Sequence, residues 1–141
     1  MEDRYLFKAK FDDSDRWVKG QLVEVNDTYL IIPNHASKIL AGWFSTSNVV
    51  EVKKDTICQC TGLKDKNGKL IWENDIVGFW DAYSTENGQA EMDCIGKVVW
   101  DDETISFQVT NRLYAESYEV LDECSVIGNI FDNPELLGVG L

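Results

Sequence analysis

The chain has 141 residues, and its 25 acidic and 13 basic residues give a formal net charge of −12. This length suits one domain or two closely packed subdomains that share a core. Binding to nucleic-acid phosphates requires clustered Lys and Arg, so the charge balance argues against direct DNA or RNA binding. No terminal segment resembles a signal peptide and no apolar run is long enough to cross a bilayer, so we expect a cytoplasmic protein with reduced cysteines.

The charge is unevenly distributed along the chain. Up to Cys60 there are 8 basic and 9 acidic residues, whereas from Thr61 onward there are 5 basic and 16 acidic residues. We therefore predict an N-terminal β subdomain over residues 1–60 and a small-barrel subdomain over residues 61–141, packed as one unit. Such an acidic surplus usually serves solubility, and in some proteins it forms a docking face for a basic partner.

In the N-terminal part, apolar and polar residues alternate with the period of half-buried strands. Gly20, inside one of these strands, suggests a bulge or a close backbone approach. Asn26-Asp27 is a turn, and Pro33 ends the strand that follows it. The segment from His35 to Asn48 is irregular and is predicted to be mainly loop. The predicted strands cover residues 5–10, 17–25, 29–32 and 49–52.

The centre of the chain carries the strongest hairpin signal. Asn67-Gly68 lies between two apolar segments, and this dipeptide typically fills both positive-φ positions of a type I′ turn. Glu73-Asn74-Asp75 is a second polar corner, after which an apolar run restarts at Ile76. The stretch is predicted to fold as strand, tight turn, strand, corner and strand.

The remaining chain continues in the same way. Residues 81–93 are predicted to form a long exposed loop or the tip of a long hairpin, and Asp101-Asp102-Glu103 to form a turn between two strands. Near the end, Asn133 is the expected N-cap of a short helical turn that begins at Pro134. About ten short strands with little helix predict an all-β fold, a small β-barrel or sandwich.

These segments resemble the YopX family of bacteriophage and prophage proteins. Residues 61–69, Thr-Gly-Leu-Lys-Asp-Lys-Asn-Gly-Lys, are similar to the family's most recognisable segment, and residues 73–77 to its usual Glu-Gly-Asp-Ile-Val continuation. Residues 126–137 resemble the closing segment of the family, and residues 7–10 and 17–20 resemble pieces of its N-terminal part. The resemblance therefore spans the whole chain.

The resemblance implies a mostly β, small-barrel fold, a phage-encoded protein inside a bacterial host cell, and self-association into a homo-oligomer. It brings no catalytic residues, and no cofactor is predicted. Two positions depart from the family pattern. Asn74 replaces the usual glycine, which asparagine tolerates because it also enters the left-handed region. Ala9 also replaces a glycine, which leaves a tight backbone approach there in doubt.

Four cysteines and one histidine raise the question of a metal site. Structural zinc sites usually pair their ligands as Cys-x-x-Cys, whereas the close pair here is Cys58-x-Cys60, and Cys94 and Cys124 stand apart. Buried thiols are the simpler interpretation, so no metal is predicted. His35 has no nucleophile motif around it and is read as a surface loop residue.

The five tryptophans are read mainly as core residues, because aromatic side chains bury large areas. Trp43 and Phe44, in the irregular region, are the candidates for an exposed interface. The favoured hypothesis is a non-enzymatic module that self-associates or docks on a host or phage protein, with an acidic surface. The alternative is a small hydrolase or metal-dependent enzyme that uses His35, Asp75 or the cysteines.

Overall fold

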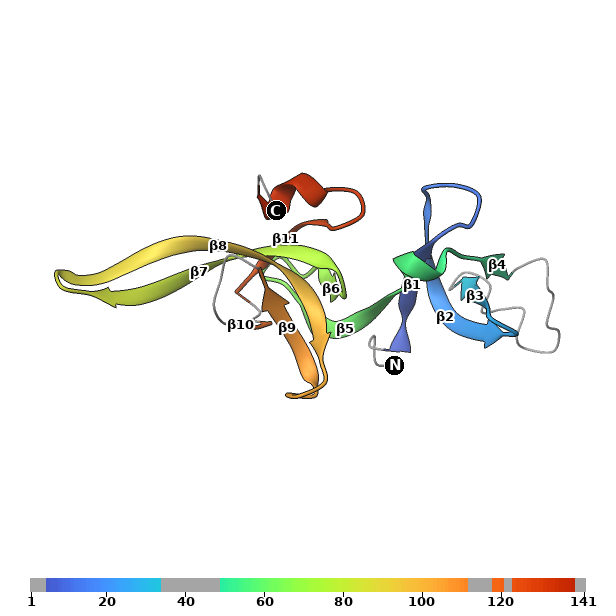
Figure 1. Ribbon diagram of the computed structural model, residues 1–141, viewed down its shortest axis with the longest axis horizontal. Coiled ribbons are helices and arrows are strands. Elements are labelled where there is room, and N and C mark those ends of the chain that lie inside the picture. The colour runs from blue at the N-terminus through green and yellow to red at the C-terminus, as the bar shows by residue number, and fades with distance from the viewer. Residues whose placement is uncertain (1–4, 34–48, 112–117, 121–122, 139–141) are drawn as a thin grey trace. The chain divides into compact units, whose positions relative to one another are not determined.

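The computed structural model describes residues 5–33, 49–111, 118–120 and 123–138, with the backbone alone for residues 80–85, 89–93 and 118–119 (Figure 1). The described chain is mainly β, which confirms the predicted fold class. Two short 3₁₀ turns accompany the strands, η4 (Lys54–Thr56) and η5 (Pro134–Leu137). The strands are β1 (Phe7–Lys10), β2 (Trp17–Val25), β3 (Thr28–Pro33), β4 (Val50–Glu51), β5 (Cys58–Lys64), β6 (Leu70–Trp72), β7 (Asp75–Thr85), β8 (Gly88–Asp101), β9 (Ser106–Thr110), β10 (Tyr118–Glu119) and β11 (Ser125–Asn129).

The strands form two antiparallel sheets. One has the order β4-β3-β2-β1-β5-β6 and the other β10-β9-β8-β7-β11. Among the described strands each sheet has two ends, so the barrel form of the prediction is not observed. The chain divides into two compact units, Met1–Gly62 and Leu63–Leu141.

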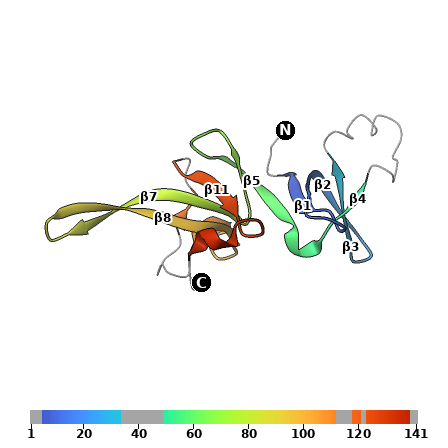
Figure 2. The same ribbon diagram turned by 90° about the horizontal axis from the view of Figure 1, so that it is seen from above.

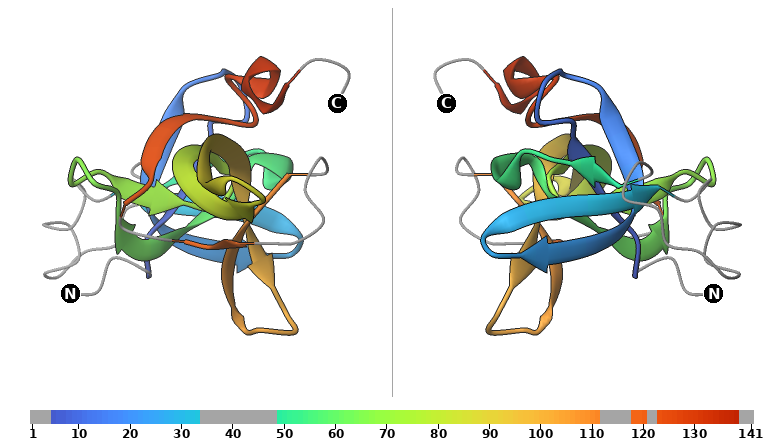
Figure 3. Two further views of the ribbon diagram at one scale, coloured as in Figure 1. Left: turned by 90° about the vertical axis from the view of Figure 1, so that its left-hand side faces the viewer. Right: turned by 90° about the vertical axis from the view of Figure 1, so that its right-hand side faces the viewer.

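The N-terminal unit is built on the meander β1-β2-β3, seen in blue in Figure 3. Gly20 pairs with Pro33, and a Cβ on this glycine would collide with the carbonyl oxygen of Ile32. The predicted close backbone approach at Gly20 is therefore confirmed. The inner face of the meander forms a core from the buried residues Ala9, Val18, Ile31 and Val52.

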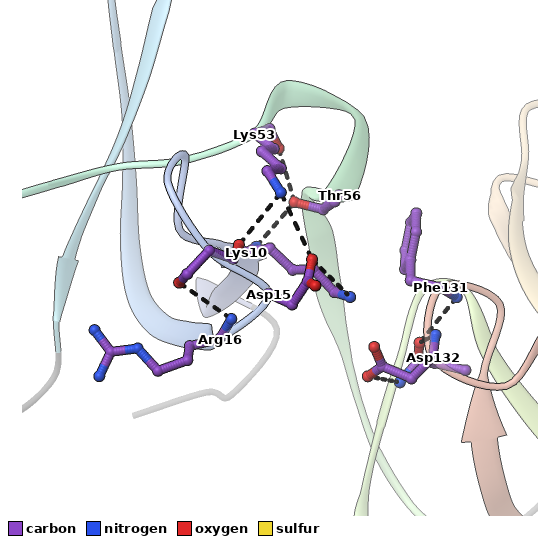
Figure 4. Close-up of polar contacts among 9 residues, drawn as sticks. Lys10, Asp15, Arg16, Lys53, Thr56, Phe131 and Asp132 are labelled. Atoms are coloured by element: carbon purple, nitrogen blue, oxygen red, sulfur yellow. Dashed lines mark hydrogen bonds and ion pairs between the residues drawn. The ribbon is translucent and has the colours of Figure 1, made fainter.

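A hydrogen-bonded connection holds η4 against β1 in this unit (Figure 4). The hydroxyl of Thr56 accepts a bond from the backbone N–H of Lys10 and donates one to the carbonyl of Lys53, both at 2.8 Å. The ammonium of Lys53 donates to the carbonyl of Ser14 at 3.3 Å and lies 3.7 Å from the carboxylate of Asp15. One small hydroxyl thus satisfies two backbone groups where the chain enters β5.

In the C-terminal unit, β7 and β8 pair along ten positions, from Ile76 opposite Lys97 to Thr85 opposite Gly88. Figures 1 and 2 show this hairpin as a long curved arm that extends past the other strands of the unit. Residues 81–93 are therefore the distal part of a long hairpin, the second of the two predicted alternatives. The core of the unit lies at the other end of the arm and contains Ile71, Val77, Val98, Val109 and Cys124.

The β5–β6 turn differs from its prediction. The backbone N–H of Gly68 donates to the carbonyl of Asp65, and Gly68 has a φ of +81°, but Asn67 does not have a positive φ. This is the pattern of a type I turn followed by a left-handed glycine, so the predicted type I′ turn at Asn67-Gly68 is wrong. The type I′ dihedral signs occur instead at Asn26 (+49°) and Asp27 (+64°), the two-residue loop between β2 and β3.

Asp65 explains the turn geometry. Its Oδ1 accepts hydrogen bonds from the backbone N–H groups of Asn67 and Lys69, both at 2.9 Å, and its Oδ2 accepts one from Val126 on β11. Burial of the carboxyl raises the pKa of Asp65, but the three backbone hydrogen bonds and the Lys69 charge outweigh it, so the pKa lies below its usual range. The side chain selects the type I turn and joins it to β11.

Two further local predictions concern polar corners. Asn74 has a φ of +69°, as expected of the residue that stands where the family has glycine. Asn133 does precede η5, with Pro134 as its first residue, but its side chain makes no capping bond. Its Oδ1 instead accepts a bond from the backbone N–H of Asn129 at 3.3 Å. The side chain of Asn129 in turn accepts from Phe131 and Asp132, which closes the β11–η5 turn (Figure 4).

Candidate functional site: the tip of the β8–β9 hairpin

An aromatic pair with one exposed member lies near the end of the β8–β9 hairpin. Trp100 on β8 is opposite Phe107 on β9, and their ring centroids are 5.1 Å apart with the planes at 73°, an edge-to-face contact. Phe107 packs against the core of the unit, whereas 44% of Trp100 is exposed. The core therefore supports one face of this aromatic pair, and the indole is presented to solvent on a rigid base.

The turn of the same hairpin carries a second exposed apolar side chain. Ile105 is 74% exposed, the largest exposed fraction among the large hydrophobic residues that the structure describes. It also has a φ of +53°, which is rare for a β-branched residue because the left-handed region crowds its Cβ. Backbone outliers of this kind cluster at functional sites, which makes Ile105 a candidate site residue.

Polar contacts hold the turn in place around these two residues. The indole Nε1–H of Trp100 donates to the carboxylate of Asp102 at 2.8 Å, which fixes the orientation of the ring. The backbone N–H of Glu103 donates to Asp101 at 2.9 Å, and the hydroxyls of Thr104 and Ser106 lie 2.8 Å apart. The turn is therefore ordered before any partner arrives, which lowers the entropic cost of binding.

The charge at this tip is negative. Asp101, Asp102 and Glu103 follow Trp100 directly, and Lys97 is the one basic residue between positions 88 and 110. The tip thus combines an apolar centre with a carboxylate border. This arrangement complements a basic surface that contains an apolar pocket, because the centre supplies affinity and the charged border supplies orientation.

The sequence prediction missed this site. Trp43, Phe44 and His35 lie outside the described residues, and the tryptophans were assigned mainly to the core. Trp72 is indeed buried, at 3% exposure, but Trp100 is not. The available signal was the predicted turn at 101–103, because a tryptophan next to a polar turn lies at the end of a hairpin. No sequence signal predicts the positive φ of Ile105, since isoleucine is seldom found in the left-handed region.

The enzyme alternative would use His35, Asp75 or the cysteines, and the structure places Asp75 and the cysteines in the interior. Asp75 is 2% exposed, and its carboxylate accepts a bond from the backbone N–H of Trp72 at 2.8 Å in the β6–β7 corner. Cys58, Cys60, Cys94 and Cys124 are each buried, and no disulfide joins any two of these four. Within the described residues, no three Cys, His, Asp or Glu side chains gather in a metal-ligand arrangement.

The described helical segments include none that is long and apolar enough to cross a membrane. Fold and site together define an all-β protein of two antiparallel sheets with an exposed aromatic hairpin tip. The sequence model described as YopX protein matches residues 6–138, nearly the whole chain, and the chain therefore belongs to the YopX family. No curated protein matches the chain.

Proposed function

We propose that the protein is a non-enzymatic binding module that docks, through the tip of its β8–β9 hairpin, on a basic surface of another protein. The observation that carries this proposal is the exposed Trp100, held by Phe107 and Asp102, beside the exposed Ile105. Trp is the residue type most enriched in binding hot spots, and ordered aromatic anchors bind at low entropic cost.

Charge complementarity supports a basic partner. Residues 63–141 carry 16 acidic and 5 basic side chains, and three of the acidic ones border Trp100 and Ile105. Two copies of such a tip repel one another, so tip-to-tip pairing of the chain is disfavoured. The homo-oligomer expected from the family resemblance stays a prediction and would use another surface. Size-exclusion chromatography with light scattering, and a metal assay on the same fractions, tests it.

In the test, the wild-type chain and the Trp100→Ala variant are each used to isolate bound proteins from host cells. The two sets of recovered proteins are then compared. Every recovered protein is identified by mass spectrometry, and its affinity is then measured with both purified partners. We expect one basic protein to bind the wild type, with an affinity loss of about 30-fold in Trp100→Ala, as for a hot-spot residue worth about 2 kcal/mol.

Val25→Ser is the matched control, because Val25 is a similarly exposed apolar residue at the end of β2 in the other unit. It should leave the affinity unchanged within twofold. A partner that binds wild type and Trp100→Ala equally, or that loses as much affinity with Val25→Ser, would contradict the proposal.

A further inference from the structure

A cavity of about 420 Å³ lies in the C-terminal unit, and residues of β7, β8 and β11 contribute to its lining. These three strands are neighbours in one sheet, in the order β8-β7-β11 (Figure 2). Its walls are mainly apolar, with Phe79, Ile95 and Ile127 among the lining residues. The volume is near the lower end of the range found for small-molecule sites. None of the lining residues belongs to the β8–β9 tip, so the cavity is a separate feature of the unit.

A glycine makes the hollow. Gly78 on β7 is opposite Ile95 on β8 and opposite Ser125 on β11, so the three residues form one row across the sheet. Residues in one row point to the same face, and the middle one has no side chain. A Cβ on Gly78 would meet nothing nearer than the carbonyl oxygen of Cys94, at 3.8 Å. The backbone packing therefore leaves room for a Cβ at this position. A larger side chain would project into the cavity, so the glycine keeps the cavity open.

Two opposite charges stand at the cavity. Lys66 and Glu123 both line it and both are exposed. The backbone N–H of Lys66 donates to the carbonyl of Cys124 at 2.9 Å, so Lys66 lies beside the residue that follows Glu123 and directly precedes β11. Among the described residues, neither charge takes part in an ion pair. Both charges can therefore turn to a ligand without breaking an existing pair.

We propose that this cavity binds a small zwitterion with an apolar side chain, of the chemical class of the branched and aromatic α-amino acids. The ligand carboxylate would pair with Lys66 and its ammonium with Glu123, while its side chain fills the hollow above Gly78 between Ile95 and Ile127. Charge-assisted hydrogen bonds are the stronger class, and apolar burial adds to them. A ligand with only one of the two charges would leave the other rim residue unused.

Isothermal titration calorimetry with the full chain tests the ligand class. The probes are free phenylalanine and leucine, with three comparison compounds: N-acetylphenylalanine, which lacks the ammonium, phenylalaninamide, which lacks the carboxylate, and alanine, which lacks the apolar side chain. We expect saturable 1:1 binding of phenylalanine or leucine and at least tenfold weaker binding of all three comparison compounds. Equal binding of the blocked compounds, or no binding of either free amino acid at 10 mM (roughly the weakest useful affinity), overturns the proposal.

Variants of the lining residues test whether the ligand binds in the cavity. Gly78→Val should abolish binding by filling the hollow, and Lys66→Gln and Glu123→Gln should each weaken it at least tenfold. Lys64→Gln is the matched control, because Lys64 is exposed on β5 and does not line the cavity. Because a bulky residue in β7 can lower stability, each variant is first checked for cooperative unfolding, and the two surface variants decide the outcome if Gly78→Val is unfolded. Wild-type binding by Lys66→Gln and Glu123→Gln also overturns the proposal.

Discussion

The carboxylate of Asp65 accepts a hydrogen bond from the backbone N–H of Val126 at 2.9 Å, although 61 positions separate the two residues along the chain. The backbone N–H of Lys66 donates to the carbonyl of Cys124 at 2.9 Å beside it. Together these contacts join the β5–β6 turn to β11, the strand at one end of its sheet. The first contact also occupies a backbone N–H of β11, that of Val126, which could otherwise pair with another chain.

Asp65→Ala should destabilise the C-terminal unit by roughly 3 kcal/mol, because three backbone N–H groups lose their acceptor and such groups are costly to leave unsatisfied. Urea denaturation measures the loss. Asp13→Ala, at an exposed turn position of the other unit, is the control and should stay within about 0.5 kcal/mol of wild type. Equal stability of the two variants would show that the Asp65 contacts contribute nothing.

The stability should also depend on pH through this residue. The pKa of Asp65 is lower in the folded chain than in the unfolded one, where it is about 3.9. Its stabilising contribution is therefore fully present above that value and is lost as the pH falls through the folded pKa. Urea midpoints measured between pH 7 and pH 2 should fall more steeply for wild type than for Asp65→Asn. Parallel curves would contradict the assignment.

Gly20→Ala should destabilise the N-terminal unit by about 2 kcal/mol or more, since its new Cβ would collide with the Ile32 carbonyl on the neighbouring strand. Gly78→Ala is the matched change, because it is also a strand glycine but its Cβ would make only an ordinary contact. We expect Gly78→Ala to be neutral or slightly stabilising in thermal unfolding. A similar loss for both variants would mean that generic strand effects, not the close approach, decide the outcome.

Ile105→Asn should have opposite effects on folding and binding. Asparagine enters the left-handed region more readily than a β-branched residue, so the variant should gain up to about 1 kcal/mol in the free energy of unfolding. It should also bind the basic partner more weakly, because the tip loses an apolar contact. Denaturation and affinity are measured on the same preparation. A variant that is both less stable and fully able to bind would refute this account of Ile105.

The sequence predicted the strands better than it predicted how they are joined. Period-2 alternation and turn residues located most strands, because these signals are local. The type of the β5–β6 turn depended on Asp65, whose three hydrogen bonds reach as far as Val126, and a dipeptide rule does not include such a contact. By contrast, Asn26 and Asp27 do have the positive φ angles of a type I′ turn. Val25 pairs with Thr28 on either side of them, so the loop has two residues, the length that favours this turn.

The candidate site was harder to predict for the same reason. Whether a tryptophan is buried depends on what packs over it, and the edge contact of Trp100 with Phe107 is set by strand register rather than by local sequence. The sequence shows that apolar and acidic residues are close together in this part of the chain. It does not predict that they lie on one ordered turn, because that order depends on the polar contacts of Asp101, Asp102 and Thr104.

Site-specific cross-linking tests the central claim most directly. A photoreactive residue replaces Thr104 at the hairpin tip or, as the control, Val25 on β2, and both chains are irradiated inside the cells that produce them. The account predicts one major adduct from position 104, to a basic protein, that is not formed from position 25 and that disappears when Trp100→Ala is added. No adduct from position 104, or the same adducts from both positions, would contradict the hairpin tip as the binding surface.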